Sequence, residues 1–254
     1  MKRICALLVV WTVGIACARA QIDVYYVRHA EAGHNVTTAF KASGIPTNEW
    51  PAYVGNQNAL TPAGEAQIAA LTEGLKEQRF DLIAVSPIWR TRQTILPYVQ
   101  ASGQTAELWP ELAETHAFEL TPEALAAPVA ADLIEGRQVI RLPPEEEAWF
   151  VVGAPGTAPR LFSVTNAAEA VAVARRVEEK LRERFAGRPG RVLLVGHGNS
   201  SLTLLRHLRR EPGLRERHLG NVQFWNGVLE SDGSFRMRDY NRPADKIFGE
   251  TSSQ

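Results

Sequence analysis

Arg28 and His29 are the neighbouring residues of this chain with the clearest capacity for chemistry. They follow the run Ile22–Val27, whose β-branched and aromatic residues predict a buried strand. A strand that ends on an arginine and a histidine brings a fixed cation and a titratable nucleophile to one edge of a sheet. In open α/β sheets the carboxyl edge is where ligands bind. The pair therefore indicates a ligand site at this edge.

Arg90 and His197 extend this pattern. Arg90 follows a short strand that we expect at Asp81–Val85, and His197 follows the apolar run Val192–Val195. If all three strands are parallel, these side chains converge with His29 at one edge. The planar fork of arginine matches phosphate oxygens, and a neutral imidazole can attack phosphorus. Nearby arginines also disfavour the imidazolium form of His29, so the four residues predict a pocket for a dianionic oxyanion.

The elements that must position these groups alternate between strand and helix, which is typical of a sheet with parallel strands and crossover helices. Glu31–Asn58 is polar and contains Gly and Pro, and we expect it to be a long loop that lines the site. Arg92 is interpreted as a helix-surface residue or a charge behind the site. We further expect a helix from Pro62 with Thr61 as its N-cap, helices at 89–100 (kinked or shortened at Pro97), 122–135, 166–186 and 200–209, a strand at 105–109, a hairpin over 221–240, and otherwise irregular structure over 111–159.

Five segments, in this order along the chain, resemble the motifs of the histidine phosphatase superfamily, also called the phosphoglycerate-mutase-like family. They are Arg28–Glu31 for the R-H-G-E box (with Ala at the glycine), Leu60–Gln67 for L-T-x-x-G-x-x-Q, Ser86–Thr94 for S-P-x-x-R-x-x-Q-T, Leu112–Glu114 for L-x-E, and Val195–Gly198 for the second histidine box. The resemblance covers most of residues 22–241. It implies an α/β fold, a three-layer sandwich with a mostly parallel central sheet and helices on both faces.

The resemblance also implies roles for the residues that match its motifs. His29 would attack phosphorus and form a phosphohistidine. Arg28, Asn35, Arg90 and His197 would bind and stabilise the transferring phosphoryl group. No metal or other cofactor is expected, because the arginines and His197 supply the positive charge.

Glu114 is the proton donor that the resemblance implies; it would protonate the departing alkoxide and then activate water. Glu111 and Glu119 stay open as alternatives, because they lie in the same segment. In the mutase branch the acid is followed by Arg-His-Tyr-Gly, whereas this chain has Thr115–Phe118. The departure favours a phosphatase that hydrolyses phosphomonoesters. A phosphoglycerate-type mutase, a protein-phosphohistidine phosphatase and a phosphate-binding module without turnover are the alternatives.

Residues 1–20 have the pattern of a secretory signal peptide, with Lys2 and Arg3, the apolar run Ile4–Ala16 and the A-x-A site Ala18–Ala20. The apolar run is too short to span a bilayer. We therefore expect cleavage after Ala20 and a secreted or periplasmic hydrolase whose residues 21–254 form one catalytic domain. A retained N-terminal anchor is the alternative.

Composition argues against several function classes. Lys and Arg number 28, as do Asp and Glu, and no dense basic stripe indicates nucleic-acid binding. Cys5 and Cys17 both lie in the expected signal peptide, so thiol catalysis is excluded after its removal. His29 and His34 are five residues apart with a glycine between them, a spacing that argues against a zinc site. The expected partner is a small phosphorylated substrate, with no stable membrane insertion after cleavage; the sequence indicates no oligomeric state.

Overall fold

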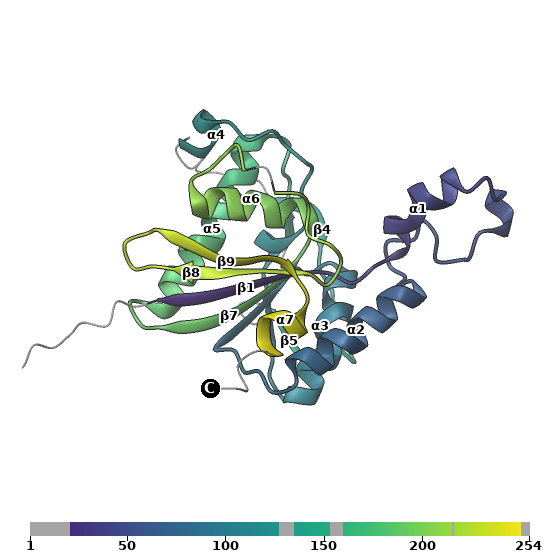
Figure 1. Cartoon of the computed structure of the whole chain (residues 1–254), viewed down its shortest axis with the longest axis horizontal. Helices are drawn as coiled ribbons and strands as arrows, with labels where there is room; N and C mark the ends of the chain where they lie inside the picture. Colours follow the sequence, from purple (N-terminus) through teal and green to yellow (C-terminus); the bar gives the residue numbers. More distant parts are fainter. Residues whose placement is uncertain (1–20, 127–134, 153–159, 215, 250–254) are drawn as a thin grey trace, which may run out of the picture.

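The computed structural model describes residues 21–126, 135–152, 160–214 and 216–249. The expected signal peptide, residues 1–20, lies outside these ranges. A seven-stranded sheet runs through the molecule in the order β5-β3-β2-β7-β1-β8-β9 (Figure 1). Its strands are β1 (Ile22–Arg28), β2 (Leu82–Val85), β3 (Ala106–Leu108), β5 (Phe150–Val151), β7 (Gly190–Gly196), β8 (Phe224–Leu229) and β9 (Phe235–Arg242).

The sheet is mostly parallel, as the sequence predicts. β1, β2, β3, β5 and β7 run in one direction. β8 is antiparallel to β1, and β9, which is antiparallel to β8, returns to the direction of β1. β1 and β7 pair over their whole length, from Ile22 opposite Gly190 to Arg28 opposite Gly196. Both faces of β1 are buried, which explains why its apolar residues form a continuous run rather than an alternating one.

Helices cover both faces of the sheet. Tyr25 and Val27 of β1 belong to an apolar cluster with α2 (Pro62–Leu75), α3 (Trp89–Ser102) and α7 (Ala244–Phe248). Val24 and Tyr26 point to the other cluster, with α5 (Ala167–Phe185) and α6 (Gly198–Arg209). Figure 1 shows these two helix layers on opposite sides of the sheet. The three-layer sandwich is therefore confirmed.

Two predicted helices begin close to the expected residues, and the predicted N-cap of the first, Thr61, is confirmed. The Thr61 side chain accepts a hydrogen bond from the Gly64 amide at the start of α2, and the Asn166 side chain accepts one from Glu169 at the start of α5. Pro97 does not shorten α3, which continues to Ser102. Its neighbours Tyr98 and Val99 are fully buried, and this packing offsets the cost of a proline inside a helix.

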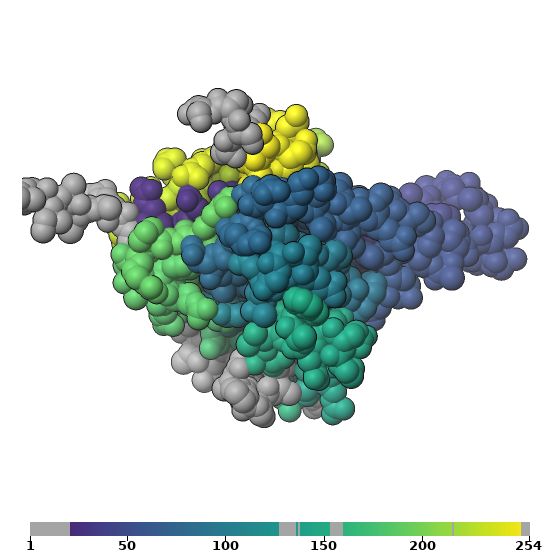
Figure 2. All heavy atoms as spheres, turned by 90° about the horizontal axis from the view of Figure 1, so that it is seen from below, coloured from purple at the N-terminus to yellow at the C-terminus, as the bar shows by residue number. Residues whose placement is uncertain are grey.

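The segment expected to be a loop, Glu31–Asn58, is partly helical, so that prediction is wrong. It contains α1 (Gly33–Ala42) and the 3₁₀ turn η1 (Thr47–Glu49). The Asn35 side chain accepts a hydrogen bond from the Ala32 amide and so caps the start of α1. The Gly and Pro content of the segment had favoured a loop instead. Residues 33–58 project from the body as an arm, visible in both Figure 1 and Figure 2.

The helix expected at 122–135 does not reach residue 135, so its predicted end is wrong. α4 covers Pro122–Ala126, and residues 127–134 lie outside the described ranges. Glu135 begins β4 (Glu135–Val139), which pairs antiparallel with β6 (Arg160–Phe162) in a separate two-stranded sheet. The 3₁₀ turn η2 (Pro110–Leu112) and β5 add further order to the region expected to be irregular.

The predicted hairpin forms between β8 and β9. Gly233 in its turn has a φ of 94°, a left-handed value that favours glycine. Across the described ranges, we find no helix with both the length and the apolar character to cross a bilayer.

Candidate active site

Three parallel strands end side by side and bring the predicted residues together. His29 follows β1, Ser86 follows β2, and His197 follows β7, which lies between the other two. Both histidines are buried, and their ring centroids are 5.1 Å apart. The predicted convergence of the strand ends is therefore confirmed.

The hydrogen bonds of His29 define its tautomer. Nδ1 lies 2.7 Å from the carbonyl oxygen of Ala30 and can only donate to it. Nε2 accepts a hydrogen bond of 3.2 Å from Nε of Arg90, so its lone pair faces the arginine. Burial lowers the pKa of His29 well below 6.5, and the charges of Arg90 and Arg28 lower it further. His29 is therefore a neutral imidazole whose Nε2 carries the lone pair, and in this structure that lone pair accepts from Arg90.

Arg90 owes its position to the start of α3. The Thr94 hydroxyl donates to the Arg90 carbonyl and accepts from the Ala30 amide, so it ties the first turn of α3 to the end of β1. The Arg90 side chain is buried, and burial lowers its pKa from the ordinary arginine value. The α3 N-terminus at the same edge adds the positive end of a helix dipole.

His197 is held from two sides. Its Nε2 lies 2.9 Å from the hydroxyl oxygen of Ser86, and its backbone amide donates to the Tyr26 hydroxyl. Nδ1 is buried without a hydrogen-bond partner, 4.0 Å from Oε2 of Glu114. Burial lowers its pKa well below 6.5, and the neighbouring His29 and Arg90 lower it further. Ser86 is thus a supporting residue of the site that our sequence reasoning placed there without a role.

Glu114 is the carboxylate that the fold brings to the histidines. Oε1 accepts from the Asn199 and Ser200 amides, at 3.1 and 3.4 Å, at the N-terminus of α6. Burial raises its pKa above the ordinary value, against the lowering effect of these hydrogen bonds. Glu111 instead pairs with Lys180 at 3.0 Å, and Glu119 is exposed. The geometry therefore favours Glu114 among the three carboxylates.

Arg28 lies beside the start of α6. Its Nη1 donates to the Leu219 carbonyl at 2.6 Å, and its Nε is buried without a partner. A Cβ at Gly198 would lie 3.7 Å from that Nε and 3.3 Å from the His218 ring. A Cβ there would thus be in ordinary contact with Arg28 and in tight contact with His218, which shows how closely the start of α6 approaches Arg28.

His34 is a site residue that our sequence reasoning considered only as a metal ligand. Its ring lies 5.6 Å from that of His29, and burial, with Arg90 and Arg28, lowers its pKa to about 4. Asn35 Oδ1 accepts from a backbone amide, so Asn35 Nδ2, 3.2 Å from His34 Nε2, must donate to it. His34 therefore carries its proton on Nδ1, which is buried without a partner. The sequence did contain a signal for His34, because it lies one residue before Asn35, close to the end of β1.

Asn35 itself reaches the site through His34. Its amide oxygen is committed to capping α1, and its amide NH₂ faces the His34 ring. In residues 21–126, 135–152, 160–214 and 216–249, no group of three or more His, Cys, Asp or Glu side chains is placed to hold a metal ion.

Of the two interpretations of Arg92, the helix-surface one is wrong, and the structure agrees with the other, a charge behind the site. It is buried, its Nε pairs with Glu146 at 2.5 Å, and its Nη1 donates to the Pro87 carbonyl. Glu146 also accepts from Gln93 at 2.7 Å. Arg92 therefore fixes the turn between β2 and α3 and the segment that carries Glu146, while Arg90 is left to face the histidines.

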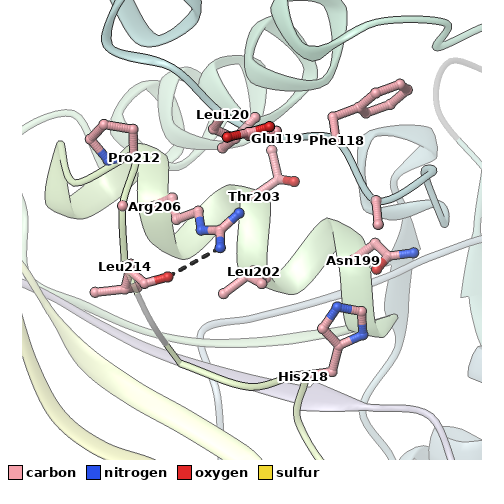
Figure 3. A pocket seen from close by; sticks show the side chains of 12 residues that line it. Phe118, Glu119, Leu120, Asn199, Leu202, Thr203, Arg206, Pro212, Leu214 and His218 are labelled. Atoms are coloured by element: carbon pink, nitrogen blue, oxygen red, sulfur yellow. Dashed lines mark hydrogen bonds between the residues drawn. The ribbon is translucent and has the colours of Figure 1, made fainter.

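Two hollows flank the site. One, of about 580 Å³, has Arg90 and Glu114 in its wall. The other, of about 610 Å³, lies against one face of α6 and is shown in Figure 3. There Arg206 donates to the Leu214 carbonyl at 3.1 Å and closes one end, and Asn199 lines the other. The Asn199 backbone also donates to Glu114, so a hydrogen bond links the wall of this hollow to the wall of the other.

Solved structures share this fold at low sequence identity. "Mycobacterial hydrolase 1" has a TM-score of 0.53 at 20% identity, covering 88% of this chain and 99% of its own. A phosphoglycerate mutase from Bacillus anthracis has 0.52 at 18%, covering 89% and 95%. A phosphoserine phosphatase mutant from Entamoeba histolytica has 0.51 at 16%, covering 87% and 96%. None of the curated proteins compared matches the chain.

The sequence profile of one family matches nearly the whole described chain. It is the histidine phosphatase superfamily (branch 1), and the match spans residues 24–243. This range includes all five motifs that carry the resemblance and every side chain of the site described above. The chain belongs to the histidine phosphatase superfamily, with a phosphoglycerate-mutase-like fold.

Proposed function

We propose that the protein is an exported phosphatase that hydrolyses a small phosphomonoester through a phosphohistidine on His29. One observation supports this above all: a neutral His29 directs Nε2 at a buried arginine, beside a carboxyl group whose pKa burial raises. Nucleophile, anion-binding cation and proton donor are then present at one sheet edge. Export rests on the pattern of residues 1–20.

In the first step, Nε2 of His29 attacks phosphorus, and the bond from phosphorus to the leaving oxygen breaks. The ring becomes cationic as the P–N bond forms, and its Nδ1–H already donates to the Ala30 carbonyl, which stabilises that charge. Glu114 gives its proton to the leaving oxygen. This requires the protonated carboxyl, the form that its burial favours.

In the second step, the Glu114 carboxylate takes a proton from water. The water oxygen attacks phosphorus, the P–N bond breaks, and inorganic phosphate and neutral His29 result. Arg28 and Arg90 bear fixed positive charge that opposes the negative charge on the transferring oxygens in both steps. His197 donates a hydrogen bond to the same group, and Ser86 fixes its ring.

The comparison structures include both a phosphatase and a mutase, and this chain's own residues favour hydrolysis. Thr115–Phe118 replaces the Arg-His-Tyr-Gly that follows the acid in the mutase branch. The arginine and the tyrosine of that motif are Thr115 and Ala117 here, so these two positions offer neither a cation nor a phenol to hold a phosphoglycerate for a second transfer.

Rapid mixing with a ³²P-labelled phosphomonoester tests the proposal. We expect a base-stable, acid-labile phosphoenzyme in the wild type, its absence in His29→Ala, and release of inorganic phosphate. Movement of the label within one molecule would establish a mutase instead. Tight phosphate binding without any turnover would establish a binding module.

A further inference from the structure

The hollow above Arg90 and Glu114 is lined by amides, and we call it the amide hollow. Its other described lining residues are Gly55, Asn56, Gln57, Asn58, Ile88, Gln138 and Leu161. Four of these carry a carboxamide. Among the described lining residues, Arg90 is the one cation. The volume of about 580 Å³ is in the range of small-molecule sites.

The leaving group of a phosphomonoester must occupy the amide hollow. Phosphorus has to come within bonding distance of Nε2 of His29, which lies 3.2 Å from Nε of Arg90. The leaving oxygen has to come within hydrogen-bond distance of the Glu114 carboxyl group. Arg90 and Glu114 both line the amide hollow. Neither of them lines the hollow of Figure 3. The rest of the substrate therefore extends over the amides.

These amides are available to a ligand. Within the described part of the chain, the side chains of Gln57, Asn58 and Gln138 are exposed and bond to no other residue. Asn56 uses its amide oxygen to accept from the Asn58 backbone at 2.8 Å, which leaves its NH₂ group to donate. The amides come from two separate elements, the base of the arm and β4, so two parts of the fold contribute to the lining.

The chemistry of the lining selects among leaving groups. A carboxamide offers both donors and acceptors, as a hydroxyl group does, so the two pair in either direction. A carboxylate or a second phosphate calls for a cation, and leaving it unpaired beside neutral groups is costly. Arg90 cannot serve, because it faces His29 and the reacting phosphate.

We propose that the leaving group is an uncharged, hydroxyl-rich alcohol of the size of a sugar or polyol, held by Gln57, Asn58 and Gln138. This inference rests on the proposed phosphatase function. It assigns the amide hollow as the specificity site and excludes phosphorylated carboxylic acids as preferred substrates.

The test compares kcat/KM of the wild type for four probes: glucose 6-phosphate, 3-phosphoglycerate, O-phosphoserine and p-nitrophenyl phosphate. We expect glucose 6-phosphate to exceed both carboxylates by about tenfold or more. Gln57→Lys adds a cation to the hollow and should shift the ratio towards 3-phosphoglycerate by about tenfold. Gln100→Ala, which removes an exposed amide of α3 outside the hollow, should leave all ratios unchanged.

Failure of this inference is distinguishable from failure of the phosphatase proposal. Hydrolysis of p-nitrophenyl phosphate with a preference for the carboxylates, or an unchanged ratio in Gln57→Lys, would overturn the inference alone. If no probe is hydrolysed, the phosphatase proposal fails. Calorimetric binding to His29→Ala then decides the inference: tighter binding of glucose 6-phosphate than of 3-phosphoglycerate supports it, and the reverse overturns it.

Discussion

At the residue scale, the site needs a neutral base and a protonated acid at the same pH, and it uses a different residue for each. In the proposed mechanism, His29 must be neutral to attack phosphorus, and Glu114 must be protonated to donate to the leaving oxygen. Burial achieves both, because it lowers the pKa of the histidine and raises that of the carboxyl group. The arginines reinforce the first effect and oppose the second.

The proton donor can be tested through the leaving group. Glu114→Gln keeps a side chain that can accept from the Asn199 amide but cannot give up a carboxyl proton. We expect kcat/KM to fall roughly 10²–10⁴-fold for glucose 6-phosphate and much less for p-nitrophenyl phosphate, whose leaving group needs no proton. Parallel assays of the two esters check this. Equal losses on both would remove Glu114 from the role of general acid.

The pH profile should report the lowered pKa of His29. The nucleophile is lost only when pH falls through that pKa, which lies well below 6.5. We therefore expect kcat/KM for p-nitrophenyl phosphate, corrected for ionisation of the ester, to stay near its maximum from pH 6.5 to pH 5. A profile from pH 3.5 to 8 measures it. A half-maximal point at or above pH 6.5 would show that His29 is protonated like an ordinary histidine.

At the element scale, the arm over residues 33–58 forms one wall of the site because its base is tied down. The Gly33 amide donates to the Ala59 carbonyl, and the Gly33 carbonyl accepts from the Gly55 amide, both at 2.9 Å. A Cβ at position 33 would lie 1.6 Å from the Tyr53 carbonyl oxygen. Glycine is therefore required where α1 begins.

Gly33→Ala should displace the arm's base and, with it, the amides at 56–58. We expect kcat/KM to fall about tenfold or more, because small displacements of positioning groups are costly to catalysis. Gly249→Ala, at a site with open space and an ordinary φ, is the matched control. Steady-state assays and circular dichroism of both variants provide the measurement. Wild-type kinetics in Gly33→Ala would show that the arm does not position the site.

The sequence predicts the elements whose signals are local. β1 and β7 follow from apolar runs, α2 from its capping residue Thr61, and α5 from a segment with Ala, Val and Leu on one side and Arg and Glu on the other. The β4–β6 sheet could not be predicted, because its pairing joins segments more than twenty residues apart without a strong apolar pattern. In the site, too, the residues of local motifs could be predicted. The place of His34 beside His29 could not, and its tautomer is defined only by its contact with Asn35.

At the scale of the whole molecule, α5 and α6 are joined by a buried charged network. Glu178 lies 2.8 Å from His207 Nε2, 2.9 Å from Arg182 and 3.0 Å from Arg210. Burial alone would raise the pKa of Glu178, but the hydrogen bond from His207 and the arginine charges outweigh it and lower the pKa to about 2. The network fastens the helix layer that carries Asn199 and Ser200.

This network should make stability depend on pH. Because the folded pKa of Glu178 is depressed, its contribution is complete above about pH 4.5 and is lost as pH falls towards 2. Glu178→Ala should lower the free energy of unfolding by about 3 kcal/mol at pH 7, and by less at pH 3. Urea unfolding at both pH values measures it, with the exposed Glu179→Ala as control. A difference independent of pH would assign the loss to packing.

The hydrogen bond from Arg90 to His29 has one further consequence. In the free protein the arginine occupies the lone pair that must attack, so the resting nucleophile is masked by its own anion receptor. A tetrahedral dianion can draw the guanidinium aside, whereas a neutral carboxylic ester offers it little reason to move. On the proposed mechanism, phosphate binding and exposure of the nucleophile would occur together, and an electrophile that does not draw Arg90 aside would not meet a free Nε2.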